Sequence, residues 1–315
     1  MMPVPDAILR VPNNILLDRN GPAIRKAGIM DYIQLFAAAG MWGGTFLLNE
    51  IALVDFAPVA IAAYRIMLAA LILCLVCYWK GLIPKLNTRS MWLILAIGLL
   101  NSVVPFSLIG WGQLRIDSST TAILLATSPF FALLLSHYMT RDDRFAWNKL
   151  AGLAVGFLGV IVLMWQGQAQ GGGSLAGMIV VVLAGCCYSL SAILIRKLSD
   201  MPSLVLVAST LTVASIILIP VLLWWYPPWE QLHQASSMSA LLFLAVGPTA
   251  TAYVLRVRIV KSNGAVFMSN VGYLIPLFAV FWSWLFLSQK PSVIMWLSLV
   301  LIFTGLAIGQ RKSRG

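Results

Sequence analysis

Long apolar runs alternate with short polar segments along almost the whole chain. The runs at 61–77 and 204–225 are much longer than the alternating strands of a membrane β-barrel, so they favour helices. A helix needs about 20 apolar residues to cross a bilayer. Runs bounded by charged residues, glycine or proline predict ten spans, at about 31–49, 57–79, 90–113, 118–139, 147–166, 174–196, 203–226, 238–258, 264–287 and 292–310. We therefore predict an all-α polytopic membrane protein with ten transmembrane helices.

The distribution of charge tests this count. The chain is 60% hydrophobic and 10% charged with a formal net charge of +11, whereas soluble domains carry about 25% charged residues. Cytoplasmic loops of membrane proteins are rich in Lys and Arg. Of the 21 bases, 18 fall on the side of the N-terminal tail, and only Arg115 and Lys290 fall on the other side. This split predicts ten spans with both termini cytoplasmic, in a bacterial-type inner (plasma) membrane. The positive face meets the lipid bilayer, and no nucleic-acid partner is expected.

Two halves of the chain share weak internal similarity. Pro129-Phe130-Phe131-Ala132 has a counterpart in Pro276-Leu277-Phe278-Ala279, and Trp42 has a counterpart in Tyr188. Five spans is an odd number, so the second half enters the membrane from the opposite side and the repeats are inverted. Inverted repeats suit alternating access in carriers. The predicted units are a cytosolic tail at 1–30, a five-helix repeat at 31–166, an extracytoplasmic linker at 167–173, a second repeat at 174–310 and a cytosolic tail at 311–315.

Several of these segments carry a family resemblance. The dipeptide Trp42-Gly43 and the stretches 63–70, 122–129 and 152–159 resemble the EamA-type half of the drug/metabolite transporter superfamily, and 184–202 with 265–309 resembles a second copy. The Gly-Glu that often ends the fourth and ninth spans is replaced here by Arg141-Asp142-Asp143 and by Ser288-Gln289. The resemblance implies a transporter rather than an enzyme, for amino acids, metabolites, purines or drugs. Within the superfamily the chain is similar to exporters of aromatic amino acids.

Prolines interrupt four of the spans at matching places in the two halves. Pro105 corresponds to Pro248, and Pro129 corresponds to Pro276. Each proline leaves the carbonyl four residues earlier without its helical donor, and lipid tolerates such a carbonyl only where protein or a water-filled cavity satisfies it. A single proline could simply kink a helix for packing. Four in matching pairs favour a central cavity, with these prolines in a structural or gating role.

Polar and aromatic side chains on the same spans are the substrate-binding candidates. Ser and Thr could instead bond to their own backbone, and aromatic rings could fill space between helices. The candidates are Trp42, Asn101, Trp111, Thr127, Ser128, Tyr188, Thr249, Tyr253, Asn270 and Tyr273.

Ionisable groups are scarce within the predicted spans. All ten acids lie outside the spans or at their rims, and only Arg65 and His137 lie inside. Arg65 could snorkel outward, brace the fold against carbonyls or face a substrate carboxylate, and we rank bracing first. A binding site without a buried acid and with one cation fits neutral or zwitterionic small molecules. We therefore predict export of such metabolites, most of all amino acids including aromatic ones, by a facilitated carrier.

Other classes are open at this point. A proton-coupled exporter of other metabolites or drugs is the first alternative, followed by a membrane-embedded enzyme and a channel. No catalytic residue, metal or cofactor is expected, because Cys74-x-x-Cys77 lies in an apolar span without a nearby His or acid. Gly152-x-x-x-Gly156 and Gly305-x-x-x-Gly309 permit close helix contact within one chain or between two, so both a monomer and a homodimer are possible.

Overall fold

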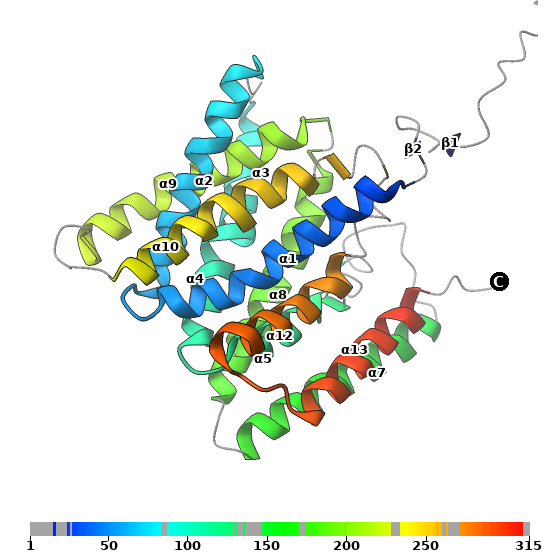
Figure 1. Cartoon of the computed structure of the whole chain (residues 1–315). Helices are drawn as coiled ribbons and strands as arrows, with labels where there is room; N and C mark the ends of the chain where they lie inside the picture. The colour runs from blue at the N-terminus through cyan, green and yellow to red at the C-terminus, as the bar shows by residue number, and fades with distance from the viewer. Residues whose placement is uncertain are drawn as a thin grey trace, which may run out of the picture.

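The computed structural model is a bundle of long helices (Figure 1). It describes residues 15–16, 24–25, 27–82, 87–128, 130–131, 135, 147–169, 174–198, 200–227, 234–256, 258–259, 263 and 271–310. The helices of these ranges are α1 (Ile29–Ala52), α2 (Pro58–Trp79), α3 (Thr88–Gly98), η1 (Leu99–Val103), α4 (Val104–Gln113), α5 (Ser118–Leu125), α7 (Trp147–Ala169), α8 (Leu175–Arg196), α9 (Ser203–Trp225), α10 (Ala235–Leu244), η2 (Ala245–Thr251), α12 (Val271–Leu287) and α13 (Val293–Gln310).

A minimal strand pair precedes the bundle and differs from the purely helical expectation. Strands β1 (Ile15–Leu16) and β2 (Ile24–Arg25) are antiparallel, with Ile15 opposite Arg25. An isolated pair of two-residue strands is shorter than an independently stable sheet, so it does not change the fold class. The chain is an all-helical membrane protein in the part that carries its core.

Five of the described helical stretches are long and apolar enough to cross a membrane, namely 58–79, 88–113, 175–195, 203–225 and 235–256. Shorter apolar helices lie at 154–163, 274–287 and 293–305. Large apolar side chains on the outside of the bundle fit a lipid environment. Tryptophans are exposed toward the ends of their helices, as an interfacial aromatic belt requires: Trp79, Trp92, Trp165, Trp224 and Trp225.

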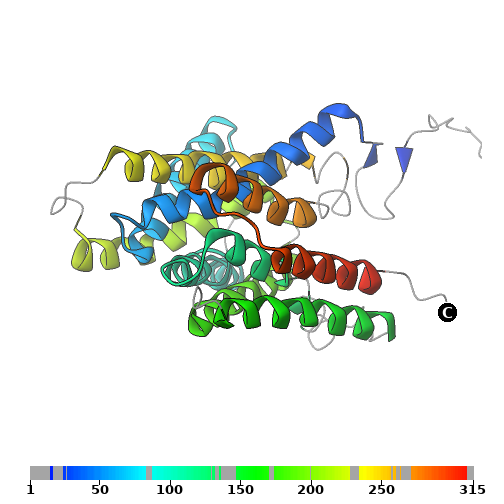
Figure 2. The same cartoon turned by 60° about the horizontal axis from the view of Figure 1, so that its bottom comes forward.

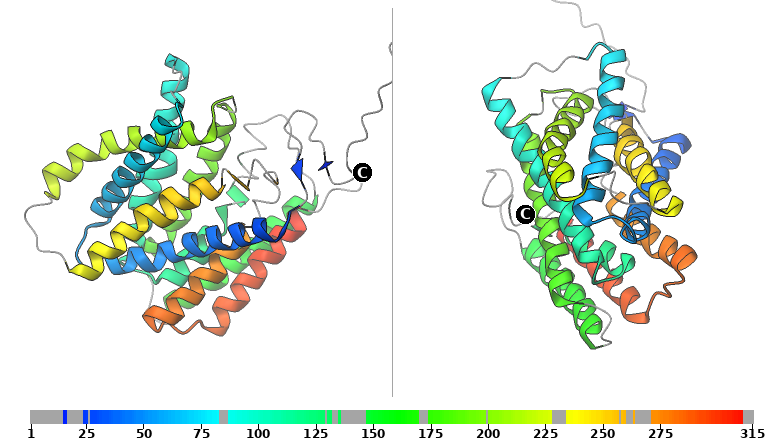
Figure 3. Two further views of the ribbon diagram at one scale, coloured as in Figure 1. Left: turned by 45° about the horizontal axis from the view of Figure 1, so that its top comes forward. Right: turned by 90° about the vertical axis from the view of Figure 1, so that its left-hand side faces the viewer.

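The packing between the two halves is symmetric in its main contacts: a contact made by a helix of one half has a counterpart made by the equivalent helix of the other half. Helix α2 packs against α9, and α7 packs against α13, so the second and fifth helices of each half face their counterparts. In the same way, the contact of α4 with α8 corresponds to that of α10 with α1. The contact of α5 with α8 corresponds to that of α12 with α1. Figure 2 shows α7 and α13 running side by side, and Figure 3 shows α10 beside α1.

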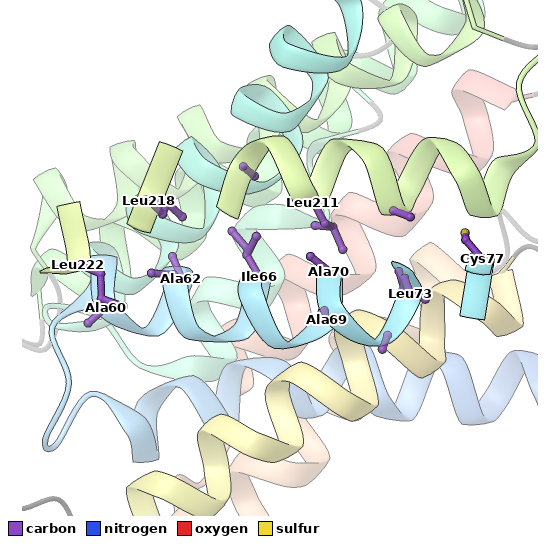
Figure 4. Packing of buried hydrophobic residues seen from close by; sticks show 14 of the residues in the cluster. Ala60, Ala62, Ile66, Ala69, Ala70, Leu73, Cys77, Leu211, Leu218 and Leu222 are labelled. Carbon is purple, nitrogen blue, oxygen red and sulfur yellow. The ribbon is translucent and has the colours of Figure 1, made fainter. Parts of the chain in front are cut away.

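Small side chains allow the close contact between α2 and α9. Ala62, Ala69 and Ala70 of α2 are buried against a row of larger side chains that includes Leu211 and Leu218 of α9. Figure 4 shows the two rows meeting along the helices. Lipid is as apolar as leucine, so helices in a membrane associate through such close packing rather than through the hydrophobic effect.

Glycines allow α7 and α13 to pack closely. A Cβ atom on Gly305 would lie 2.5 Å from the carbonyl oxygen of Gly152 and 2.6 Å from the backbone nitrogen of Gly156. No side chain fits at that distance, so the backbones touch. Gly152, Gly156 and Gly305 therefore make a close helix contact within one chain.

Two π-helical segments interrupt the helices where the sequence predicts discontinuities. The segment η1 ends just before Pro105, and η2 contains Pro248. Pro248 has no N–H to donate to the carbonyl of Leu244. This carbonyl instead accepts a hydrogen bond of 2.8 Å from the Thr249 hydroxyl. π-Helical turns frequently occur at functional sites. These two therefore direct attention to the side chains around them.

Candidate functional site

Polar and aromatic side chains converge where α1, α2, η1, α4, α8 and the end of η2 meet. We call this group the Arg65 cluster. It comprises Trp42, Arg65, Asn101, Phe106, Tyr188, Ser191, Thr249 and Tyr253. The members come from both halves of the chain, so any change in the relative position of the halves changes this cluster.

The guanidinium of Arg65 is the charged centre of the cluster. Its Nε and Nη2 atoms donate to the Thr249 hydroxyl at 3.2 and 3.0 Å, and its Cζ lies 4.0 Å from the centroid of the Phe106 ring. The side chain is only 5% exposed. Arg65 is seven positions after Pro58 at the start of α2, so it lies about 10 Å along the helix. The phenols of Tyr188 and Tyr253 are close enough to interact with it electrostatically.

The second arm of the cluster centres on Asn101. Its side-chain amide donates to the Tyr253 hydroxyl at 3.2 Å, and its carbonyl oxygen accepts from the Ser191 hydroxyl at 3.2 Å. The indole N–H of Trp42 donates to the carbonyl of Pro248 at 2.9 Å, and its ring meets that of Tyr253 edge-on with 6.2 Å between the centroids. One carbonyl of the η2 backbone, that of Pro248, is thus bound by a side chain of the other half.

The structure brings together half of the substrate-binding candidates. Trp42, Asn101, Tyr188, Thr249 and Tyr253 lie in the Arg65 cluster. Among the described residues, Arg65 donates to the side chain of Thr249 in the other half of the chain, and the bracing role ranked first stays a prediction.

Other candidates lie elsewhere. Trp111 is 36% exposed, and the Arg115 guanidinium lies 3.5 Å from the centroid of its ring, so this pair belongs to the surface. The hydroxyls of Thr127 and Ser128 donate to the carbonyls three residues earlier, at 2.6 Å each. Asn270 and Pro129 lie outside the described residues, as does the side chain of Tyr273.

Sequence reasoning missed Phe106 and Ser191. A phenylalanine in an apolar span carries no signal of its own. Ser191 lies three residues after Tyr188 and therefore on the same helix face, which is a signal that could have identified it.

A second polar group lies at the end of the bundle where α1 ends. We call it the Glu50 cluster, made of Asn49, Glu50, Gln113, Ser118 and Gln289. One carboxylate oxygen of Glu50 accepts from both the backbone N–H and the hydroxyl of Ser118, and the other accepts from the Gln289 side chain at 2.7 Å. Gln113 accepts from Asn49 at 2.8 Å and donates to Ser118 at 3.2 Å. The sequence indicated Glu50 only as an acid at a rim.

Neither cluster resembles a metal site. Within the described ranges, no three His, Cys, Asp or Glu residues are placed to hold a metal ion. The four cysteines are free thiols.

A helical membrane protein with equivalent halves, and with polar groups buried at their interface, has the general form of a secondary transporter. The chain belongs to the EamA-like transporter family, which it matches over residues 30–165 and again over residues 175–308. The family and its named relatives are transporters, not enzymes.

Individual relatives are distant but cover most of the chain. An S-adenosylmethionine/S-adenosylhomocysteine transporter of Chlamydia trachomatis is 28% identical over 83% of this chain and 83% of its own length. The uncharacterized transporter YvbV of Bacillus subtilis is 26% identical over 93% of this chain and 94% of its own length. A solved crystal structure shares the fold, with a TM-score of 0.65 at 16% identity, covering 90% of this chain and 97% of that one.

Proposed function

We propose that the protein exports neutral or zwitterionic small metabolites, most of all amino acids including aromatic ones, by alternating access through the Arg65 cluster. The observation that carries this proposal is the composition of the cluster. It combines four aromatic rings with amide and hydroxyl groups, and its charged member among the described residues is a single arginine. Aromatic walls with a few polar groups are typical of small-molecule sites.

A ten-span arrangement with inverted five-helix repeats accompanies this proposal. Hydrogen bonds join the connections that would lie on one side of the membrane: Glu50 with Ser118 and Gln289, Asp55 with Gln234, and Arg115 with Ser174. In a ten-span chain with both termini cytoplasmic, all of these connections face the opposite side. The matching contacts that equivalent helices make across the two halves also support a repeat.

The relative from Chlamydia adds chemical support. S-adenosylmethionine and S-adenosylhomocysteine, named for that protein, both contain an α-amino acid group with an ammonium and a carboxylate. The zwitterion proposed here has the same group. A zwitterion moves no net charge across the membrane potential, so a concentration gradient suffices, at about 1.4 kcal/mol for each tenfold difference.

Counterflow in proteoliposomes tests the proposal. Vesicles with the full chain are loaded with unlabelled phenylalanine, and uptake of labelled phenylalanine is followed against a panel of competing solutes, with and without an imposed pH gradient. We expect saturable counterflow that needs no pH gradient and that amino acids compete for best. Strict dependence on the gradient would contradict the facilitated mechanism, and absence of counterflow with every amino acid would contradict the substrate class.

A matched pair of variants ties transport to the cluster. Tyr253→Phe removes the hydroxyl that accepts from Asn101, whereas Tyr226→Phe removes a hydroxyl at the end of α9, outside the cluster. Counterflow should weaken in the first variant and stay at the level of the unaltered protein in the second.

A further inference from the structure

The hydrogen bonds of Arg65 are unevenly distributed around its guanidinium. The group has five N–H donors. Two of them, on Nε and Nη2, donate to the same oxygen of Thr249. The remaining three have no partner among the described residues. They lie on Nη1 and Nη2, which form the end-on edge of the group.

A buried cation with free donors is costly, and the described acids do not offset this cost. Glu50 bonds to Ser118 and Gln289, and Asp117 bonds to Thr120. The stacked Phe106 ring attracts the cation through its π face but accepts no hydrogen bond in the guanidinium plane. Intramembrane ionisable residues without such partners mark substrate or ion paths by default.

The shape of the free edge selects the anion. Two parallel N–H groups match the two oxygens of a carboxylate, in the bidentate geometry for which arginine is suited. A phosphate would bring a second negative charge, and the described residues of the cluster provide one cation. A monoanionic, planar group therefore fits best.

We propose that the end-on edge of Arg65 binds the carboxylate of the transported molecule, and that Thr249 acts as a positioning residue that holds this edge toward the binding site. The inference rests on the proposed function and makes it more specific, because it makes a carboxylate a requirement for binding. The aromatic rings of Trp42, Tyr188 and Tyr253 then surround the rest of the molecule.

Matched acid and amide pairs test the carboxylate requirement on the purified full chain. The probes are phenylalanine with phenylalaninamide, and 3-phenylpropionate with 3-phenylpropanamide, and binding is measured from the rise in the thermal unfolding midpoint. We expect each amide to bind about 10- to 100-fold more weakly than its acid, the range for a hydrogen-bonded charged partner. Equal binding of acid and amide, or no binding of either acid, would overturn the proposal.

Variants assign the requirement to Arg65. Arg65→Gln should bind acid and amide equally, Arg65→Lys should give an intermediate ratio because it keeps the charge without the fork, and Arg115→Gln should keep the full ratio. An unchanged ratio in Arg65→Gln would overturn the assignment. If Arg65→Gln does not fold, the Arg65→Lys variant decides, since an unaltered ratio there contradicts a bidentate contact.

The positioning role of Thr249 has its own control within η2. The hydroxyls of Thr249 and Thr251 each donate to the carbonyl five residues earlier, but Thr251 is exposed. The acid-to-amide ratio should fall in Thr249→Val, recover in Thr249→Ser and stay unaltered in Thr251→Val. Equal effects of the two valine variants would reduce Thr249 to a purely structural role.

The carboxylate site at Arg65 and the proposed transport of amino acids can each be contradicted without the other. If 3-phenylpropionate binds through Arg65 but vesicles transport no amino acid, the carboxylate site stands and the proposed function falls. If vesicles transport amino acids but acids and amides compete equally, the function stands and the role of Arg65 falls.

Discussion

The Arg65 cluster and the Glu50 cluster both join the halves of the protein around an ionisable side chain, but they treat its charge in opposite ways. Both oxygens of the Glu50 carboxylate accept hydrogen bonds, from Ser118 and Gln289. Arg65 donates twice to one hydroxyl and leaves its end-on edge open. The hydrogen bonds of the Glu50 carboxylate hold the fold together, although Gln289 Oε1 beside it is buried without a hydrogen-bond partner among the described residues. The open edge of Arg65 instead leaves donors that a ligand could use. In our proposal, this difference separates a structural group from a binding group.

The largest expected effect is on transport in Arg65→Gln. Loss of one partner of a buried charge pair costs about 2–5 kcal/mol, so counterflow should fall about 30-fold or more. The free energy of unfolding without substrate should change by less than about 1 kcal/mol, because the variant also removes the cost of a buried charge. Initial rates and thermal unfolding measure the two effects. Arg115→Gln is the control, since its stacking on Trp111 is exposed.

Glu50→Ala should show the reverse pattern. Its removal leaves the backbone N–H of Ser118 and the side-chain amide of Gln289 without this acceptor, whereas the Ser118 hydroxyl keeps the carbonyl of Phe46. Each buried donor left unpaired costs about 1–3 kcal/mol. We expect the protein to be destabilised by about 2–3 kcal/mol in thermal or chemical unfolding, with the acid-to-amide selectivity unchanged. Asp55→Ala, at an exposed contact with Gln234, should cost less than about 1 kcal/mol. Altered selectivity in Glu50→Ala would break the distinction between the clusters.

Thr249→Val should have a smaller effect on transport than Arg65→Gln. The valine keeps the volume but cannot accept from Arg65, so the guanidinium loses its orientation while keeping its charge. Loss of a hydrogen bond to a charged group costs about 1.5–3 kcal/mol, and the retained charge of Arg65 places the expected decrease in counterflow at the lower end of that range, about tenfold. Thr251→Val should transport like the unaltered protein. Equal rates for both variants would contradict the positioning role.

The smallest effect concerns the backbone beside Gln289. Ser288 has a φ of 56°, in the left-handed region that favours glycine, and it stands where the resembled superfamily often has glycine. Ser288→Gly should relieve this strain and stabilise the protein by about 0.5–1 kcal/mol in unfolding experiments. Destabilisation would show that the serine side chain contributes more than its backbone costs.

The helices were largely predictable because their signal is local. Apolar runs between charges gave the positions of α2, α8 and α9 to within a few residues. Prolines predicted interruptions, since a proline removes a defined hydrogen bond, and π-helical segments lie just before Pro105 and at Pro248, whereas Pro276 lies inside α12. The count of ten spans and the inverted relation of the halves remain predictions.

The binding candidates were harder to predict because contacts across helices depend on the direction in which each side chain points. Asn101 and Tyr253 are 152 residues apart and meet only in the folded protein. Trp111 lies on the same helix as Phe106 but faces outward, and sequence position alone does not distinguish the two. Glu50 looked like an ordinary rim residue because its partners lie on distant connections.

The central claim is that the transported molecule binds at the Arg65 cluster through the carboxylate of that molecule. One measurement tests this claim most directly. Phenylalanine and phenylalaninamide compete for counterflow in vesicles with the unaltered protein, with Arg65→Gln and with Glu50→Gln. The account predicts an acid-to-amide ratio of about 10 to 100 for the unaltered protein and for Glu50→Gln, and about 1 for the residual counterflow of Arg65→Gln. A ratio that survives in Arg65→Gln, or that is lost in Glu50→Gln, would contradict it.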